Sequence, residues 1–251
     1  IASDSSGDWL VLEYVSGYKD PADWTAGDYM SAAAGLVDLH DRFWDLGKDL
    51  MAFQWLARPL DTDFEVHVGA AANSIETMVY SGKPQMLAGD PAVMNMLADL
   101  TIHAVEIGAV LVDQPRVLLH GSYWPGNIAM EDGEKTVLDW AHAAAGPALL
   151  DLVVFCKKSA WLFSPLPVSE AELVRAYREG IRKATGYQWT EERWGQVWDA
   201  ALMWIFIQDW LDLLAVSPDS LLESRRDLLE RIWFEPVCLA LGRLLEGLQK
   251  A

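Results

Sequence analysis

Residues 120–127 read His-Gly-Ser-Tyr-Trp-Pro-Gly-Asn, and this segment sets the expectation for the whole chain. The apolar run at residues 116–120 predicts a short strand that leads into it. An Asp-Gly pair at residues 132–133, flanked by two further apolar runs, is the turn signal of a β-hairpin. We therefore expect a loop that leaves one strand and enters a hairpin at Asn127, with the partner strand ending near Asp139. The hairpin strands are expected at residues 127–130 and 136–140.

The two polar residues at these strand ends predict a cation site. An amide oxygen from Asn127 and a carboxylate from Asp139 form a pair of hard oxygen ligands. Such a pair suits Mg²⁺, the usual companion of nucleotide phosphates. A structural alternative is that both side chains cap backbone groups at a turn and a strand end. On these two residues alone, the structural alternative is favoured.

The rest of the chain is predicted to be mainly helical. Residues 9–15 are rich in β-branched and aromatic side chains and predict one further strand. Cap signals include Asp90 before Pro91 and a capping box formed by Ser169 and Glu172. The expected fold class is α+β and mostly helical, with one small β-hairpin and an isolated strand at residues 116–120. Helices are expected at residues 25–46 (closed by Gly47), 64–80, 90–112, 148–163, 169–185, 190–216 and 220–249.

Composition narrows the class of protein. Of 251 residues, 52% are hydrophobic, which excludes a disordered chain. Two distant cysteines, Cys156 and Cys238, predict reduced core thiols rather than a disulfide. We find no signal peptide and no apolar run long enough to span a bilayer, so we expect a cytoplasmic protein with no membrane contact. The net charge of −18 argues against a nucleic-acid partner and suits a cationic substrate, although solubility alone also explains it.

The central segment resembles the catalytic and metal loops of the aminoglycoside phosphotransferase and choline kinase-like family, relatives of the protein kinases. That family carries His-Gly-Asp, four residues, Asn, a hairpin ending in Ile/Leu-Asp-Trp/Phe, and a later Gly-Pro and Asp-Leu. Five features fall in register here: His120, Asn127, Asp139, Gly146-Pro147 and Asp151. Residues 9–15 resemble the last N-lobe strand with its hinge, and residues 39–44 resemble the first C-lobe helix.

The resemblance implies a protein-kinase-like C-terminal lobe over residues 18–251. Residues 1–17 would supply the last N-lobe strand and the hinge, and the N-terminal lobe would be largely absent from this chain. No Gly-x-Gly-x-x-Gly motif occurs, and the chain begins with Ile1. A lone C-lobe would expose apolar surface, so we expect a partner chain, self-association or an N-terminal lobe upstream.

The resemblance also assigns roles to single residues. ATP and Mg²⁺ would be the cofactors, with Asn127 and Asp139 as metal ligands. His120 would hold the loop backbone, and Asp151 would be structural. The other histidines, His40 among them, show no metal-ligand spacing and are expected in core or surface roles. The hinge residues expected to contact adenine are Glu13, Tyr14 and Val15.

One residue departs from the pattern, because Ser122 stands where the family carries its catalytic Asp. A serine hydroxyl is not a useful base near neutral pH, and general-base help contributes roughly 10²–10⁴ in rate. The expected function is phosphorylation of a hydroxyl on a small cationic molecule, an aminoglycoside or amino alcohol, at an impaired rate. The alternatives are a pseudokinase-like module that binds a small molecule or protein without turnover, and an altered residue in an ordinary enzyme. Family analogy places the acceptor beside the acidic helices after Gly146, with Asp199, Asp209 and Asp212 as candidates.

Overall fold

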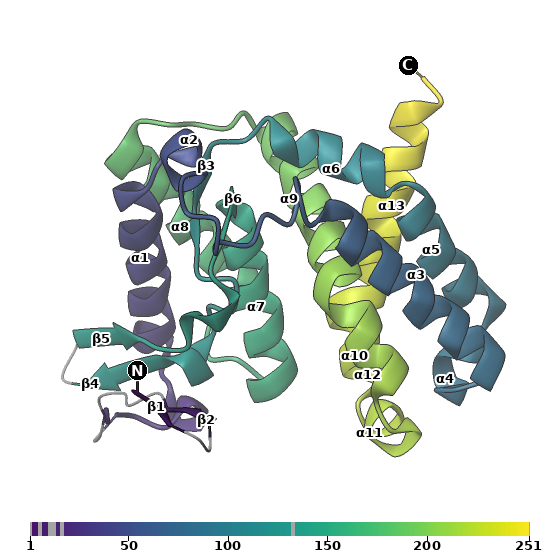
Figure 1. The fold of residues 1–251 in the computed structure, drawn as a ribbon. Coiled ribbons are helices and arrows are strands. Elements are labelled where there is room, and N and C mark those ends of the chain that lie inside the picture. The colour runs from purple at the N-terminus through teal and green to yellow at the C-terminus, as the bar shows by residue number, and fades with distance from the viewer. Residues whose placement is uncertain (1, 5–6, 10–13, 16–17, 132–133, 251) are drawn as a thin grey trace.

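In the part of the chain that the structure describes, three two-stranded antiparallel sheets accompany the helices (Figure 1). The computed structural model describes residues 2–4, 7–9, 14–15, 18–131 and 134–250. Strand β3 (Arg116–Leu119) pairs with β6 (Ala144–Pro147), and β4 (Ile128–Glu131) pairs with β5 (Glu134–Val137). The third sheet joins β1 (Ala2–Asp4) to β2 (Gly7–Trp9). The expected strand at residues 116–120 and the expected hairpin are both present.

Strand β6 corrects the expectation that β3 is isolated. Its sequence, Ala-Ala-Gly-Pro, has low intrinsic preference for a strand. All four residues are buried, and Leu118 of β3 lies opposite Ala145. Because these residues have little intrinsic preference for a strand, pairing with β3 and burial must stabilise the strand conformation of β6.

Of the strand expected at residues 9–15, the described residues place Trp9 in a strand. Trp9 ends β2, whereas Tyr14 and Val15 lie outside any strand. Residues 10–13 are outside the described part of the chain. The backbone N–H of Lys19 donates to the carbonyl of Met130 at 3.0 Å, so the chain after the predicted hinge runs beside the hairpin.

Helix starts follow their predicted caps. Thr25 and Asp28 form a capping box at α1, and Ser169 and Glu172 form the predicted one at α8. The side chain of Asp90 caps α5. The long helices are α1 (Ala26–Arg42), α3 (Phe64–Ser81), α5 (Pro91–Ile102), α6 (Ala104–Val112), α7 (Leu149–Phe163), α8 (Glu170–Thr185), α9 (Glu191–Ile205) and α13 (Glu235–Leu248). The short ones are α2 (Gly47–Leu50), α4 (Gln85–Ala88), α10 (Leu211–Val216), α11 (Asp219–Ser224) and α12 (Arg226–Leu229).

Several helix ends differ from the prediction. The first helix ends at Arg42, because Asp45 takes a left-handed conformation with φ of 55°, and Gly47 begins α2 rather than closing α1. The helix expected over residues 90–112 bends by 52° at His103. The helix expected over residues 190–216 contains a π-helical turn, Phe206–Trp210, between α9 and α10. A second π-helical turn, Glu230–Phe234, precedes α13.

The helices form two groups that meet at α7 and α9 (Figure 1). One group contains α1, α7 and α8 beside the sheets, and the other contains α3, α5, α6, α9, α10 and α13. Phe155 of α7 and Trp204 of α9 are fully buried and belong to one continuous hydrophobic core. The loop between β3 and β4 lies at the junction of the two groups, next to α7.

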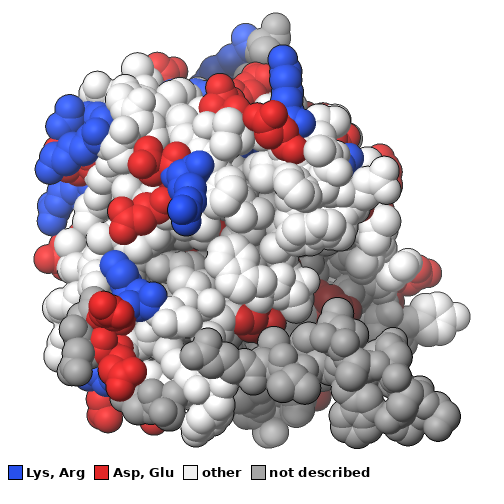
Figure 2. Space-filling model, turned by 60° about the vertical axis from the view of Figure 1, so that its left-hand side comes forward, with Lys and Arg blue, Asp and Glu red and all other residues white. Residues whose placement is uncertain are grey.

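Two composition-based expectations can be compared with the structure. Cys156 is buried as expected, whereas Cys238 is exposed and is not a core thiol. No described helix is by itself long and apolar enough to cross a bilayer, although the bent pair α5–α6 meets the length and composition criterion jointly. Figure 2 shows charged side chains gathered toward the left and upper edges of one face, with a broad uncharged area between them.

Candidate active site

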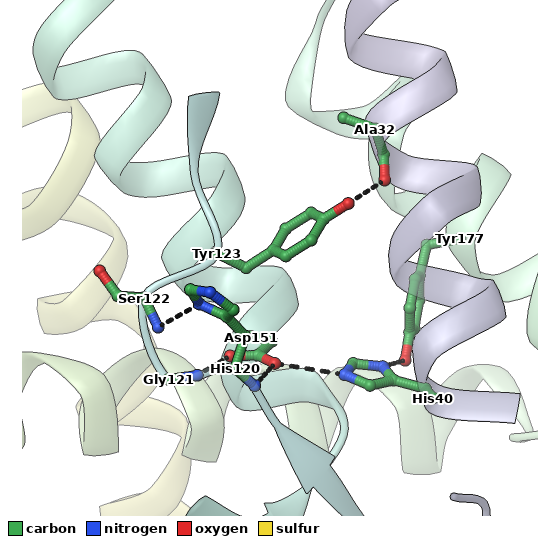
Figure 3. Close-up of polar contacts among 8 residues, drawn as sticks. All are labelled: Ala32, His40, His120, Gly121, Ser122, Tyr123, Asp151 and Tyr177. Atoms are coloured by element: carbon green, nitrogen blue, oxygen red, sulfur yellow. Dashed lines mark hydrogen bonds and ion pairs between the residues drawn. The ribbon is translucent and has the colours of Figure 1, made fainter. Parts of the chain in front are cut away.

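Asp151, in the first turn of α7, fixes the start of the loop between β3 and β4. Its carboxylate accepts the backbone N–H groups of His120 at 2.7 Å and Gly121 at 2.8 Å (Figure 3). The side chain is only 1% exposed, so these bonds form away from competing water. The loop and α7 are therefore held in one fixed arrangement.

His40 of α1 extends this network, and the sequence assigned it no such contact. Its Nε2 lies 3.3 Å from Oδ2 of Asp151, and its Nδ1 lies 2.7 Å from the hydroxyl of Tyr177 (Figure 3). Nε2 donates to the carboxylate, which can only accept, and in the neutral ring Nδ1 then accepts from the Tyr177 hydroxyl. All three side chains are buried, and burial raises the pKa of Tyr177 well above its usual value. The signal for His40 was its place in residues 39–44, the segment that resembles the family helix.

Gly121 is required by the backbone at this point. Its φ is +76°, a region that residues with a side chain rarely adopt. A Cβ there would also overlap the carbonyl oxygen of His142. The His-Gly pair thus lets the loop pass directly under the turn Trp140–His142.

His120 orients the loop through both of its ring nitrogens. Its Nε2 donates to the carbonyl of Leu138 at 2.8 Å, and its Nδ1 accepts the backbone N–H of Ser122 at 3.2 Å. These two bonds require the neutral ring with its proton on Nε2. The side chain is fully buried. His120 therefore connects the loop to the end of the hairpin and does not reach a substrate.

Asn127 and Asp139 lie on adjacent ends of the hairpin. The carbonyl of Asn127 accepts the N–H of Leu138 at 2.8 Å, and Asp139 follows directly. The side-chain Nδ2 of Asn127 donates to the carbonyl of Ser122 at 2.9 Å, so its Oδ1 remains available as a ligand. Asp139 is exposed and has a φ of 58°, which is uncommon for a residue other than glycine.

This donor set fits Mg²⁺ bound together with phosphates. Mg²⁺ usually takes one or two protein oxygens and completes its shell with substrate phosphates and water. An amide oxygen and a carboxylate meet that requirement. Among the described residues, no group of three or more His, Cys, Asp or Glu side chains is placed to hold an ion alone.

The side chain of Ser122 points away from the hydrogen bonds around Asp151 (Figure 3) and contacts Lys158 of α7. Its Oγ lies 3.2 Å from Nζ of Lys158 and 3.3 Å from Nδ2 of Asn127. Lys158 also lies over the ring of Trp124, 4.6 Å from its centroid. Burial lowers the pKa of Lys158, while the charges of Asp209 and Asp139 act in the opposite direction.

A pocket of about 590 Å³ opens beside Ser122 between α7 and the end of α9. Lys158 and Asp209 line it, together with His67 and His142. The side chain of Asp209 is exposed at the pocket, but the protein around its carboxyl group partly desolvates it and raises its pKa to about 6, against the opposing effects of a hydrogen bond from Gln208 and the charges of Lys158 and His142. Apolar walls come mainly from Leu150, Val154, Trp161, Ile205, Trp210 and Leu213.

Asp209 belongs to the π-helical turn Phe206–Trp210. Such turns often occur at functional sites. Of the three acidic candidates named from the sequence, Asp209 alone lines the pocket among the described residues. Asp199 pairs with Arg243 at 2.7 Å, and Asp212 accepts the hydroxyl of Ser74 at 3.3 Å. The sequence could not separate the three, because the π turn changes the helical position of Asp209 and of the residues after it, and no sequence signal marks that turn.

The predicted hinge is described only in part. Glu13 lies outside the described residues. Tyr14 is 87% exposed, and Val15 is partly buried. The adenine contacts expected from these three residues stay a prediction.

Comparison with known proteins identifies the family. The model of the phosphotransferase enzyme family matches residues 32–193. An aminoglycoside phosphotransferase from Alicyclobacillus acidocaldarius subsp. acidocaldarius DSM 446 has a similar structure, with 15% identity and a TM-score of 0.51 over 95% of this chain and 71% of that chain. A choline/ethanolamine kinase family protein from Mesorhizobium loti has 14% identity and a TM-score of 0.51 over 96% of this chain and 76% of that one. No curated protein sequence matches significantly.

The family model covers well over half of the chain, so the protein belongs to the phosphotransferase enzyme family. The structural matches show a kinase-like fold across most of the chain. The resemblance inferred from residues 120–151 is confirmed.

Proposed function

We propose that the protein is an ATP- and Mg²⁺-dependent phosphotransferase that acts on a hydroxyl of a small cationic molecule, at a rate limited by Ser122. One observation carries the proposal: a single pocket contains both Ser122, at the position of the family's catalytic Asp, and the carboxylate of Asp209. Its volume of about 590 Å³ falls within the range of roughly 300–1,000 Å³ typical of small-molecule sites.

The pocket chemistry supports a cationic acceptor. Asp209 supplies a carboxylate, and Trp161 and Trp210 supply aromatic walls with ring centroids 5.5 Å apart. A carboxylate beside aromatic faces favours an ammonium group. The two structural relatives are named as an aminoglycoside phosphotransferase and a choline/ethanolamine kinase family protein. An amino alcohol or aminoglycoside is therefore the acceptor class that we favour.

The proposed binding of ATP and Mg²⁺ depends on Asn127 and Asp139 at the ends of the hairpin strands. Kinases of this family generally use ATP and Mg²⁺. When bound, the metal would neutralise charge on the nucleotide phosphates, and Asn127 Oδ1 and Asp139 would hold it. His120 and Asp151 would keep the loop in position through the backbone contacts described above. Tyr14, Val15 and Glu13 remain our candidates for the adenine contact.

Ser122 sets the expected rate. Its hydroxyl cannot take the acceptor proton as a carboxylate does, so general-base help is missing. Positioning and charge neutralisation supply most of the catalysis of phosphoryl transfer, so we expect slow turnover rather than none.

A second candidate is a ligand-binding module without turnover. The contact between Ser122 and Lys158 favours it, because Nζ donates to Oγ and so occupies an accepting position that an acceptor hydroxyl would otherwise use. In this alternative the pocket binds its ligand, and nucleotide has no effect on that binding.

One experiment separates the candidates. The protein and its Ser122→Asp variant are incubated with ATP, Mg²⁺ and a panel of choline, ethanolamine and kanamycin, and phosphorylated product is measured by mass spectrometry. We expect product from at least one acceptor and an increase of roughly 10²-fold or more in the variant. The matched control is each of the two proteins with the acceptor omitted, which reports background ATP hydrolysis. Absence of product from both proteins would reject the phosphotransferase proposal and leave the binding module.

A further inference from the structure

The hydroxyl oxygen of Ser122 already accepts two hydrogen bonds, which is as many as it can accept. Lys158 carries only donors, so Nζ must donate to Oγ across their 3.2 Å separation. Asn127 also donates from Nδ2 at 3.3 Å, and its amide orientation is fixed because the same nitrogen donates to the carbonyl of Ser122 at 2.9 Å. Reversing the amide would place two oxygens against each other. Oγ therefore accepts two hydrogen bonds.

The proton of the Ser122 hydroxyl must then point elsewhere. Within the part of the chain that the structure describes, no acceptor is in hydrogen-bond contact with it. Ser122 lines the pocket, so a ligand is the available acceptor. The position that takes a proton from the acceptor in the family thus offers a proton in this protein.

Lys158 adds positive charge at the same point. Its ammonium group has three N–H donors, and one is directed at Ser122. It lines the pocket, and none of the ion pairs among the described residues includes it. Ser122 and Lys158 together present one neutral and one cationic donor, which is the set that stabilises an oxyanion.

We propose that Ser122 and Lys158 bind a phosphate group carried by a small molecule in the pocket, while Asp209 binds the amine of that molecule. The ligand class is a phosphorylated amino alcohol, a zwitterion that matches both charges of the site. The amine contact rests on the proposed function, whereas the phosphate contact stands without it. No transfer step is needed, because the ligand already carries its phosphate when it binds.

The terminal phosphate of a nucleotide is a second source of the same chemistry. Titrations without Mg²⁺ or nucleotide measure binding of the phosphorylated small molecule alone. A separate titration with ATP measures binding of the nucleotide phosphate. Phosphoethanolamine and ethanolamine form a matched pair of probes, since they differ only in the phosphate. Inorganic phosphate probes the oxyanion contact alone.

Affinities are measured by isothermal titration calorimetry on the whole protein and on Ser122→Ala, Lys158→Met and Lys183→Met. Lys183 is an exposed lysine of α8 that pairs with Glu179, so its variant controls for loss of charge. We expect phosphoethanolamine to bind about tenfold more tightly than ethanolamine. That preference should fall severalfold in Ser122→Ala and vanish in Lys158→Met, and it should persist in Lys183→Met. Circular dichroism confirms that each variant is folded.

Clear results would overturn the inference. Equal affinity for the two probes, or a preference that survives in both pocket variants, would show that the pair does not bind phosphate. Failure of both phosphoethanolamine and inorganic phosphate to bind would do the same. If only ATP binding depends on Ser122 and Lys158, the phosphate belongs to the nucleotide and our ligand is wrong. Binding of phosphate without any binding of ethanolamine supports the oxyanion contact and counts against the cationic acceptor.

Discussion

Oδ2 of Asp151 accepts the backbone N–H of His120 at 2.7 Å and joins residues 31 positions apart. The other oxygen of the same carboxylate holds Gly121, and His40 approaches from α1. A single buried charge therefore connects the loop after β3 with two helices. This arrangement suggests where the site is most sensitive to substitution.

Asp151→Asn should destabilise the protein by about 2–4 kcal/mol, because an amide leaves part of this buried donor set unpaired. The free energy of unfolding is measured by urea titration monitored by circular dichroism. Asp227→Asn, at an exposed position of α12, is the control and should change stability by less than about 0.5 kcal/mol. Equal stabilities of the two variants would contradict the structural importance assigned to Asp151.

Gly121→Ala should destabilise the fold by more than about 1 kcal/mol. The new Cβ meets the carbonyl oxygen of His142 and the backbone has a φ of +76°. Gly195→Ala in α9 is the matched control, since its Cβ has open space and alanine favours a helix. We expect that variant to unfold at higher urea concentration than the wild type. A stable Gly121→Ala protein would show that the loop path is wrong.

Asp139→Asn should keep the fold and weaken Mg²⁺-dependent nucleotide binding. Asparagine tolerates the left-handed conformation of this position, whereas alanine costs roughly 1 kcal/mol more. Thermal unfolding is followed with ATP in the presence and absence of Mg²⁺. The additional stabilisation by Mg²⁺ should disappear in both variants, and Asp139→Ala should also melt earlier. Asp113→Asn, at an exposed residue after α6, controls for a general loss of charge. Full Mg²⁺ dependence in Asp139→Asn would remove Asp139 from the proposed metal site.

Ethanolamine binding should strengthen as pH rises through 6. Partial desolvation by the surrounding protein raises the pKa of Asp209 to about 6, and the carboxylate attracts an ammonium group only when ionised. Affinity should therefore be about tenfold lower at pH 5 than at pH 7. Calorimetric titrations across this range, compared with Asp209→Asn, separate this carboxylate from His67 and His142 in the same pocket. A pH dependence unchanged in the variant would assign the effect to the histidines.

The same group affects stability with the opposite sign. Between about pH 4 and pH 6 the folded protein retains a proton on Asp209 that the unfolded chain releases. The contribution of Asp209 to stability therefore falls as pH rises through this window. Urea titrations at several pH values should show that Asp209→Asn lacks this component.

The sequence predicted the fold where local signals were strong. The caps at Asp90 and Ser169 and the hairpin turn mark their elements directly, because they depend on neighbouring residues. Strand β6 was missed, since a distant partner imposes its conformation on a segment of small residues. The bend at His103 was missed as well, since no Pro or Gly marks it.

In the candidate site too, features set by neighbouring residues were predicted and features set by distant contacts were not. The loop residues were found from their order in the sequence, but the contact of His40 with Asp151 and that of Lys158 with Ser122 were not. Those contacts join α1 and α7 to the loop, and no spacing rule connects segments so far apart. Asp209 was one of three acidic candidates until the π turn at Phe206–Trp210 placed it in the pocket.

The network around Asp151 holds the loop through backbone groups of His120 and Gly121 and leaves the side chain of residue 122 out. The Ser122 side chain contacts Asn127 and Lys158 instead, so exchanging it over evolutionary time leaves the backbone bonds of this network in place. The chemistry of this centre can thus diverge among descendants by one codon change, while the architecture around it is inherited intact.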